Sequence, residues 1–500
     1  MEKIFINSKD PTDASTLYDL LKVHFRKVDI ISSTETGPID CSKSLGGSGR
    51  NLYIEINHAE EKDQITVKVC YKDRCNERCY ECGPKEHNEQ EKNRQKRELR
   101  LAVLRTLDCP SFEISPWGIL TGVRPSKVAH RLMDQDFSEE KTAVLLQRDY
   151  ALRQDKAELL CGIAAYQRRM LWEEKNKRAV GVYIGIPFCP TRCYYCSFPS
   201  YQIKSGSNLL TDYLESLKRE IAETSFALKE KDYQVVYLYI GGGTPTVLSP
   251  KQLDDLFKCA KKELPIEDDC EISLEGGRPE TIDQDKLEIM RQHNVQRLSI
   301  NPQTMCEDTL KSIGREHTIS DVYKSVKKAR KIGIPVVNMD LIVGLPGENK
   351  QILVDTMNKT IALGPENITV HGFSIKRAAV YNKNTIDLPD WNEGQEMTGI
   401  ARHKLFEAGY KPYYLYRQKD IFAHSENVGY ALDDKICKYN IRMIEEKQTI
   451  LGFGLGAGSK IIDYKNTAIE NIYNPKDLVN YKNRLSEIIN RKVDKIGSIV

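Results

Sequence analysis

Cys189, Cys193 and Cys196 are spaced as C-x3-C-x2-C. They follow a run of apolar, β-branched residues over positions 180–186, which predicts a strand that ends in a cysteine-bearing loop. Three thiolates are one fewer than the four irons of a cubane cluster, so one iron remains open to chelate a ligand. The alternatives are a zinc loop with a remote fourth ligand, or buried thiols. We favour a 4Fe-4S cluster, because zinc explains neither the preceding strand nor the aromatic Tyr195 before the last cysteine.

Glycine and polar residues stand at the ends of the strands that we expect after this loop. The second strand ends in a glycine-rich segment over positions 241–244, and glycine lets a backbone approach a ligand closely. Glu275, Gln303 and Asp340 close or lie in the next three strands, where a buried polar group needs a partner. Arg315 offers a planar guanidinium that can pair with a carboxylate. Each could be a structural turn, a cap or surface polarity; together they favour ligand binding.

An open iron beside a glycine-rich strand end predicts S-adenosylmethionine (SAM) as the ligand, because the SAM amino and carboxylate groups can chelate that iron. One electron would then split the S–C5′ bond, and the resulting 5′-deoxyadenosyl radical would remove an unactivated hydrogen atom. The sequence therefore predicts a radical SAM enzyme.

The middle of the chain alternates between strand and helix. Helical stretches such as 209–228 and 321–331 separate six predicted strands. These strands lie at 180–186, 235–240, 271–274, 297–300, 336–343 and 368–375. Repeated βα units form a parallel sheet, and in a full or partial barrel the reactive residues lie at the carboxyl ends of the strands. We predict an α/β fold, a partial (β/α)6 TIM-type barrel over residues 176–376.

Both flanks of the barrel are predicted to be separate domains. Strands at 3–6, 51–56 and 65–70 and helices at 88–107 and 156–172 predict an N-terminal α+β domain over residues 1–175, which ends at a charged break. Beyond the barrel, the alternation fades into a Tyr-rich and Gly-rich segment. We expect residues 377–500 to form a C-terminal α+β domain that covers the substrate.

A second cysteine group lies in the N-terminal segment. Cys70, Cys75, Cys79 and Cys82 place four thiols within thirteen residues at the end of a predicted strand. Four nearby thiols could close a zinc site or an auxiliary Fe-S cluster, which could accept an electron. The other interpretation is a solvated hairpin tip without metal.

Composition excludes several classes of protein. The 74 basic and 71 acidic residues leave a formal charge of only +3, so nothing in the overall balance calls for nucleic acid. We find neither a signal peptide nor an apolar run of the ~18 to 20 residues that a membrane helix needs. The expectation is a cytoplasmic protein, in which fourteen cysteines favour metal ligands or buried thiols over disulfides.

The chain resembles the oxygen-independent coproporphyrinogen III oxidase family of the radical SAM superfamily, and most closely its coproporphyrinogen dehydrogenase subgroup with an extra N-terminal domain. The resemblance covers nearly the whole chain. It rests on Gly185–Pro199, Gly241–Thr246, Glu275–Ile282, Asn301–Thr304, Gly314–Thr318 and Asp340–Gly347, with Gly118–Lys127 before the barrel and Glu426–Tyr430 and Gly452–Lys460 after it.

The resemblance implies an oxidoreductase of heme (porphyrin) biosynthesis, which decarboxylates two propionates of coproporphyrinogen III to vinyl groups and gives protoporphyrinogen IX. The implied partners are this tetrapyrrole, one or two SAM molecules, a reductase or a flavodoxin or ferredoxin as electron donor, and an electron acceptor. Cys189, Cys193 and Cys196 would ligate the cluster, and Tyr183 would face the site as its catalytic tyrosine. The implied SAM-binding residues are Gly242, Gly243, Thr244, Glu275, Gln303, Arg315 and Asp340.

The chain departs from the family pattern at two positions. The best-studied members carry a His where this chain has Gly185, and a further Cys where it has Phe198. A second SAM molecule would therefore contact different side chains at these two positions.

A substrate with four carboxylates also needs cationic contacts. Any single basic residue is more often a solvated surface charge than a substrate contact. The candidates are Lys376, Arg377, Arg417, Lys419 and Lys460.

Two other functions fit the same scaffold. A heme chaperone relative carries His-Asn-x-x-Tyr-Trp, and the nearest match here, from Glu426 to Ala431, lacks the His and the Trp. A radical methylase or heme-modifying enzyme would instead transfer a methyl group from a second SAM.

Overall fold

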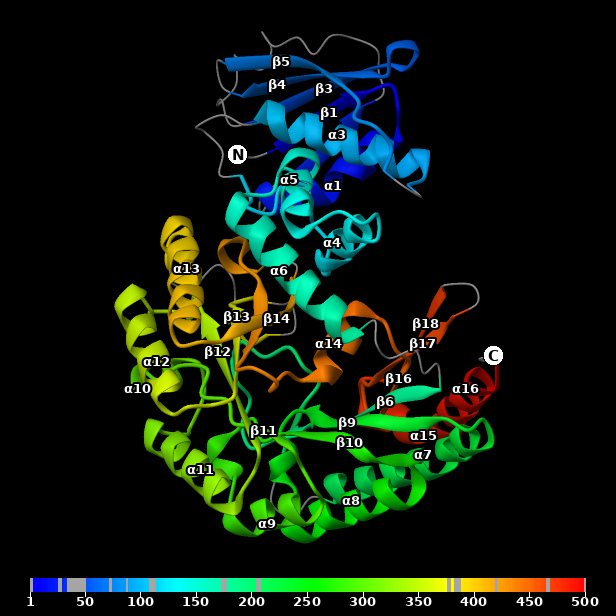
Figure 1. Cartoon of the computed structure of the whole chain (residues 1–500), viewed down its shortest axis with the longest axis vertical. Helices are drawn as coiled ribbons and strands as arrows, with labels where there is room; N and C mark the ends of the chain where they lie inside the picture. The colour runs from blue at the N-terminus through cyan, green and yellow to red at the C-terminus, as the bar shows by residue number, and fades with distance from the viewer. Residues whose placement is uncertain are drawn as a thin grey trace. The chain divides into compact units, whose positions relative to one another are not determined.

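The computed structural model describes most of the chain, in two compact units, Met1–Ala165 and Tyr166–Val500 (Figure 1). The described residues are 3–25, 29–33, 51–71, 74–86, 89–107, 114–171, 178–203, 208–375, 379–381, 388–418, 421–464 and 468–498. The division between the units falls within one helix, α6 (Gln154–Leu171).

The first unit is an α+β fold built on a five-stranded sheet in the order β2-β1-β3-β4-β5. Its strands are β1 (Lys3–Ser8), β2 (Asp29–Ser33), β3 (Leu52–Ala59), β4 (Gln64–Tyr71) and β5 (Arg74–Glu81). Its other helices are α1 (Thr12–His24), α3 (Glu91–Leu107), α4 (Ser126–Met133) and α5 (Glu139–Tyr150). Alternate residues of β3 and β4 are buried, and α3 packs against β4. One face of the sheet thus forms a core with the helix.

The second unit is built on an eleven-stranded sheet in the order β14-β15-β13-β12-β11-β10-β9-β6-β16-β17-β18. Its central strands run parallel: β6 (Ala179–Ile186), β9 (Gln234–Gly242), β10 (Ile266–Glu275), β11 (Arg297–Ser299), β12 (Val336–Val343) and β13 (Asn367–Gly372). They correspond to the six predicted strands, and the curved sheet that they form stays open, which confirms the predicted partial barrel.

Strands from the C-terminal part extend this sheet at both edges. They are β14 (Lys411–Tyr416), β15 (Asn427–Ala431), β16 (Ile450–Phe453), β17 (Gly458–Asp463) and β18 (Ala468–Tyr473). On one edge β15 pairs antiparallel with β13, and on the other β16 pairs in parallel with β6. The predicted boundary at residue 376 stays a prediction, but the C-terminal strands share one sheet with the barrel strands.

Helices cover the outer face of the curved sheet (Figure 1). They are α7 (Leu209–Glu230), α8 (Pro250–Glu263), α9 (Gln284–Gln292), α10 (Glu307–Ser312), α11 (Ile319–Ile332), α12 (Lys350–Ala362), α13 (Trp391–Glu407), α15 (Leu478–Asn483) and α16 (Leu485–Ser498). Helix α14 (Lys438–Glu445) packs on the other face of the sheet, where Tyr439 stacks on Tyr239. The parallel strands are buried on both faces, so they read as near-continuous apolar runs. Local signals place the helix ends, since Ser249 and Thr318 start α8 and α11 with capping boxes.

A buried ionic group fastens the last helices to the barrel. Glu220 of α7 accepts hydrogen bonds from Lys492 Nζ at 2.5 Å, Tyr481 OH at 2.5 Å and the Gly454 backbone N–H at 2.8 Å. The side chains of Glu220 and Lys492 are both fully buried. One carboxylate therefore connects α7, β16, α15 and α16.

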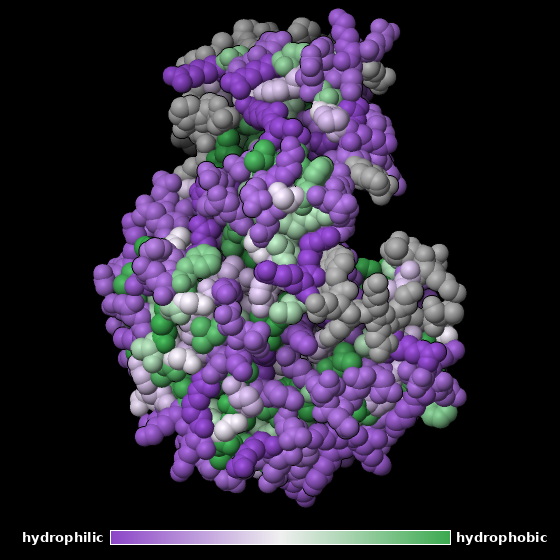
Figure 2. Space-filling model, viewed as in Figure 1, coloured by the Kyte–Doolittle hydropathy of each residue, from purple (hydrophilic) through white to green (hydrophobic). Residues whose placement is uncertain are grey.

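Hydrophilic residues cover most of the face shown in Figure 2. Among the residues that the structure describes, none of the helices is long and apolar enough to span a membrane.

Candidate active site

The loop after β6 carries the three cysteines and lies against the loop after β9. Cys189 belongs to the short strand β7 (Phe188–Cys189), which pairs with β8 (Tyr201–Gln202). The Thr244 backbone N–H donates to the Phe188 carbonyl at 2.7 Å, and Thr244 Oγ1 lies 3.6 Å from Cys189 Sγ. A Cβ on Gly243 would lie 2.5 Å from the Phe188 carbonyl oxygen and 3.0 Å from Cys189 Sγ. Only glycine fits at this approach, as the glycine-rich strand end predicts.

The segment before Arg315 contacts the same loop. The Tyr194 backbone N–H donates to the Ile313 carbonyl at 3.0 Å, and the Tyr194 ring packs on Gly314. Arg315 is buried, and its Nη1 donates to the Asn301 carbonyl at 2.5 Å. Burial alone would raise the pKa of the Cys193 thiol, but the guanidiniums of Arg315 and Arg278 lower it overall. A thiolate is thus favoured at the middle cysteine.

Burial dominates at the two outer cysteines and raises the pKa of the thiols of Cys189 and Cys196. In the described part of the chain, no three His, Cys, Asp or Glu side chains converge on a point where one metal ion could bind. The thiols of a cubane cluster bind separate irons and need no such common point.

Arg278 is a residue that our sequence analysis quoted within a motif but gave no role. It follows β10, and its Nη2 donates to both Thr191 O and Thr191 Oγ1, each at 2.9 Å. The available signal was an arginine directly after the glycines of the Glu275–Ile282 motif.

Glu275 ends β10 in a buried polar setting. Its carboxyl accepts from Tyr239 OH at 2.6 Å and from the Gly242 N–H at 3.1 Å, and burial raises its pKa to about 7. Tyr183 lies close by: its ring is 6.2 Å from that of Tyr239, and burial raises its pKa. A Cβ on Gly242, where φ is +110°, would lie 3.3 Å from Tyr183 OH.

Gln303 and Asp340 lie side by side on neighbouring strand ends. The Gln303 N–H donates to the Asp340 carbonyl at 2.9 Å, and Gln303 adopts a φ of +68°. Asn338 Nδ2 donates to the Asp340 carboxylate at 2.8 Å. Burial would raise the pKa of Asp340, but His371 lowers it overall. Gln303 Oε1 is buried without a hydrogen-bond partner, which marks an acceptor that a ligand would satisfy.

These residues fit the predicted cofactors. The thiols lie on one loop beside two guanidiniums, and Gly243 allows the loop after β9 to approach this loop closely. Carboxylate and amide oxygens at adjoining strand ends would accept from a ligand amine or hydroxyls. The structure thus brings the three cysteines and the predicted SAM-binding residues to the carboxyl ends of the parallel strands.

The predicted substrate cations are only partly placed. Lys376, Arg377 and Lys419 lie outside the described residues. Arg417 follows β14 and is buried, and this burial lowers its pKa to about 10 although Glu426 acts in the other direction. Lys460 is not brought to the site. It is paired with Glu446 at 3.1 Å, and it lies across from Ile450, at the amino end of β16.

Two cavities open at the amino ends of the strands, away from the cysteines. Their volumes are about 710 and 570 Å³; Gln296 and Pro335 line both cavities, and Arg297 lines the larger one. The amino end of such a barrel generally serves stability and the carboxyl end serves catalysis, so we keep the site at the cysteine end.

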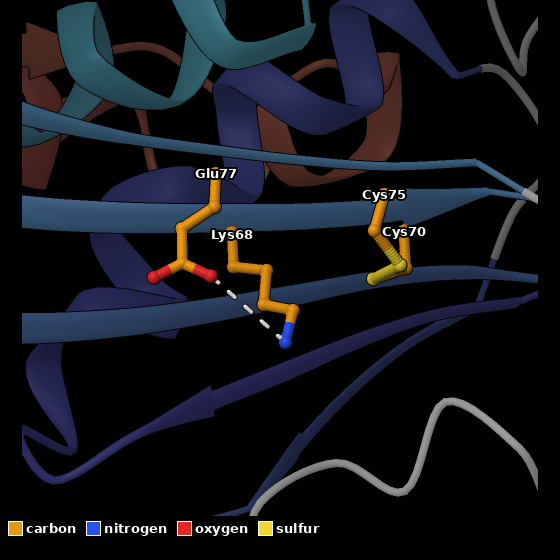
Figure 3. The surroundings of a disulfide bond; sticks show 4 residues. All are labelled: Lys68, Cys70, Cys75 and Glu77. Atoms are coloured by element: carbon orange, nitrogen blue, oxygen red, sulfur yellow. Dashed lines mark ion pairs between the residues drawn. A yellow bond between two sulfur atoms is a disulfide. The ribbon is translucent and has the colours of Figure 1, made fainter.

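The second cysteine group has a different arrangement from the predicted four-thiol site. Cys70 of β4 and Cys75 of β5 form a disulfide (Figure 3). Cys79 pairs with Thr66 further along β5, about 13 Å from Cys75 at the usual rise of a strand. Cys82 lies beyond the strand, and burial with nearby Asp63 raises its pKa to about 11. The extended strand separates the thiols, so this hairpin does not assemble a four-cysteine site.

Comparisons with known proteins agree on the family. The Radical SAM superfamily model matches residues 183–360. An oxygen-independent coproporphyrinogen-III oxidase-like protein, HemZ of Bacillus subtilis, is 39% identical over 77% of this chain and 77% of its own length. The heme chaperone HemW of the same organism is 32% identical over 55% of this chain and 69% of its own.

A solved structure shares the fold. The coproporphyrinogen III oxidase HemN of Escherichia coli, a radical SAM enzyme, superposes with a TM-score of 0.52 at 24% identity. The match covers 65% of this chain and 72% of that one.

Proposed function

The chain belongs to the coproporphyrinogen oxidase family of the radical SAM superfamily, and from this premise we propose that it oxidatively decarboxylates two propionates of coproporphyrinogen III to vinyl groups. The observation that carries the proposal is the cysteine loop, held between Thr244 and Gly314 beside the strand ends with Glu275 and Gln303. The similarity to HemZ over most of both chains supports the substrate class.

Different residues of this chain would bind the cluster, SAM and the substrate. Cys189, Cys193 and Cys196 would hold the cluster, and Gln303 Oε1 and Asp340 would accept hydrogen bonds from SAM. Glu275 would accept from the SAM ammonium, which favours its charged form. When bound, the cluster and SAM supply a carbon radical that removes a hydrogen atom from the substrate. Buried Arg417, directly after β14, would be the cation that meets a propionate.

Heme binding without turnover is the second candidate, because the HemW relatives match just over half of this chain, 55% and 56%. The matching segment here, Glu426–Ala431, consists of Glu426 and strand β15, and all of its residues are buried. This segment lacks the His of the chaperone stretch, so it offers no imidazole ligand for heme iron. We therefore place the oxidase first.

The test is turnover under anaerobic conditions. The reconstituted protein is incubated with SAM, a low-potential reductant, an electron acceptor and coproporphyrinogen III. Products are followed by liquid chromatography and mass spectrometry, with Cys193→Ala as the control. Two successive losses of CO2 plus two hydrogens, absent in the control, support the oxidase. 5′-Deoxyadenosine formation with an unchanged porphyrinogen rejects this substrate, and a Soret shift on heme titration without turnover favours the chaperone.

A further inference from the structure

A buried arginine from one strand end holds the centre of the cysteine loop. Arg278 is only 2% exposed and leaves the end of β10, two loops away from the cysteines along the chain. Its Nη2 donates to both the backbone and side-chain oxygens of Thr191, which lies between Cys189 and Cys193. The loop that would hold the cluster therefore depends on a contact made 87 residues later in the sequence.

The charge of this arginine is poorly compensated by the protein. Arg278 Nη1 is buried and has no hydrogen-bond partner. The carboxylate beside it, Glu280, lies 3.5 Å away, is 25% exposed and also faces His317 at 3.7 Å. A guanidinium stays charged in proteins, and a buried charge is costly unless an anion or hydrogen bonds offset it. Arg278 Nη1 is therefore paired with a partly exposed carboxylate but has no hydrogen-bond acceptor.

We propose that Arg278 is a positioning residue for the iron-sulfur cluster: Nη2 fixes the loop at Thr191, and the buried guanidinium charge would offset the negative charge of the thiolate-bound cluster. This inference rests on the cluster that the proposed function requires. Positive charge and hydrogen bonds near the sulfurs stabilise the reduced cluster, which carries one more negative charge. Arg278 thereby makes the cluster easier to reduce.

The experiment compares the reduction potential of the cluster in the full-length, reconstituted protein without substrate. Arg278→Met removes the charge and keeps a long side chain. Arg278→Lys keeps the charge but lacks the planar guanidinium with its paired N–H donors. Arg297→Lys is the matched control, because Arg297 is also buried in this sheet but donates to Ile436 O at 2.6 Å near the amino ends. The readout is the EPR signal of the reduced cluster during a redox titration.

At the wild-type midpoint, we expect the ratio of reduced to oxidised cluster to fall about tenfold in Arg278→Met, a shift of about 59 mV for one electron. Arg278→Lys should recover most of this shift, and Arg297→Lys should show none. A wild-type midpoint in Arg278→Met would overturn the proposal and leave Arg278 a packing role.

Two further outcomes keep the test decisive. If Arg278→Met fails to retain iron, the Arg278→Lys variant gives the answer. Retained iron with a near-wild-type midpoint in Arg278→Lys supports the role of charge. Loss of as much iron in Arg278→Lys as in Arg278→Met overturns the proposal. If the wild-type protein itself takes up no cluster, the proposed function fails, and this result is distinct from a failure of the arginine variants alone.

Discussion

At the residue scale, the Glu275 carboxyl is buried where folding favours its neutral form, whereas a bound ammonium would favour the charged one. Its raised pKa, about 7, lies above the ordinary 4.5. The folded state therefore binds an extra proton between these values, and the stability present below pH 4.5 is lost as the pH rises toward 7. The loss reaches ~3 kcal/mol at most, at about 1.4 kcal/mol per pKa unit.

We therefore expect Glu275→Gln to stabilise the cofactor-free protein at pH 8 and to leave its stability near pH 4.5 unchanged. Urea unfolding at several pH values measures this difference, which should grow between pH 5 and 7. The same variant should bind SAM at least tenfold more weakly, since it lacks the carboxylate. A pH-independent difference in stability would contradict the assignment.

Gly243 gives a second prediction at this scale. In Gly243→Ala the added methyl group would meet Phe188 O and Cys189 Sγ, so we expect the reconstituted variant to lose most of its bound iron. Gly399→Ala is the control, because nothing lies within 4 Å of its added methyl group in α13. Equal iron content in both variants would show that the close approach is dispensable.

At the scale of elements, the Glu220 group ties α15 and α16 to the barrel. Lys492→Met would leave the fully buried Glu220 carboxylate without its cation, and breaking a buried pair in this way typically costs ~3 to 5 kcal/mol. We expect the free energy of unfolding to fall by about that amount, which lowers the urea midpoint. Adding Glu220→Gln should recover part of this loss. The exposed pair Arg484–Glu487 is the comparison, and its removal should leave the midpoint unchanged. No recovery in the double variant would mean that packing, rather than charge, dominates.

The sequence predicted the elements whose signals are local. The six barrel strands are apolar runs, and α7 and α11 have helical spacing, so all of them were found. Strand β5 was missed because it is rich in exposed charged residues, such as Arg74 and Glu77, and lacks an apolar face. The pairing of β16 with β6, and the contact of Arg278 with Thr191, join residues far apart in the chain, and no local pattern encodes them.

At the scale of the whole molecule, the cysteines divide between the two units. Cys189, Cys193 and Cys196 belong to the unit with the parallel sheet, while the Cys70–Cys75 disulfide lies in the other. We expect one 4Fe-4S cluster, about four irons per chain, and no zinc.

Replacing Cys70, Cys75, Cys79 and Cys82 together by Ala should leave the iron content unchanged, as measured by elemental analysis. Cys193→Ala, in contrast, should abolish it. If the fourfold variant lost half of the iron, or lost zinc, this result would support the auxiliary metal site that the cysteine spacing suggests.

The position of β6 between β9 and β16 also has a consequence for synthesis on the ribosome. The strand that leads into the cysteine loop acquires its second neighbour only after about 260 more residues have been added. At roughly 5 to 20 residues per second, its edge stays open for about 13 to 50 s. During this time the unpaired edge of β6 is exposed to pairing with other chains.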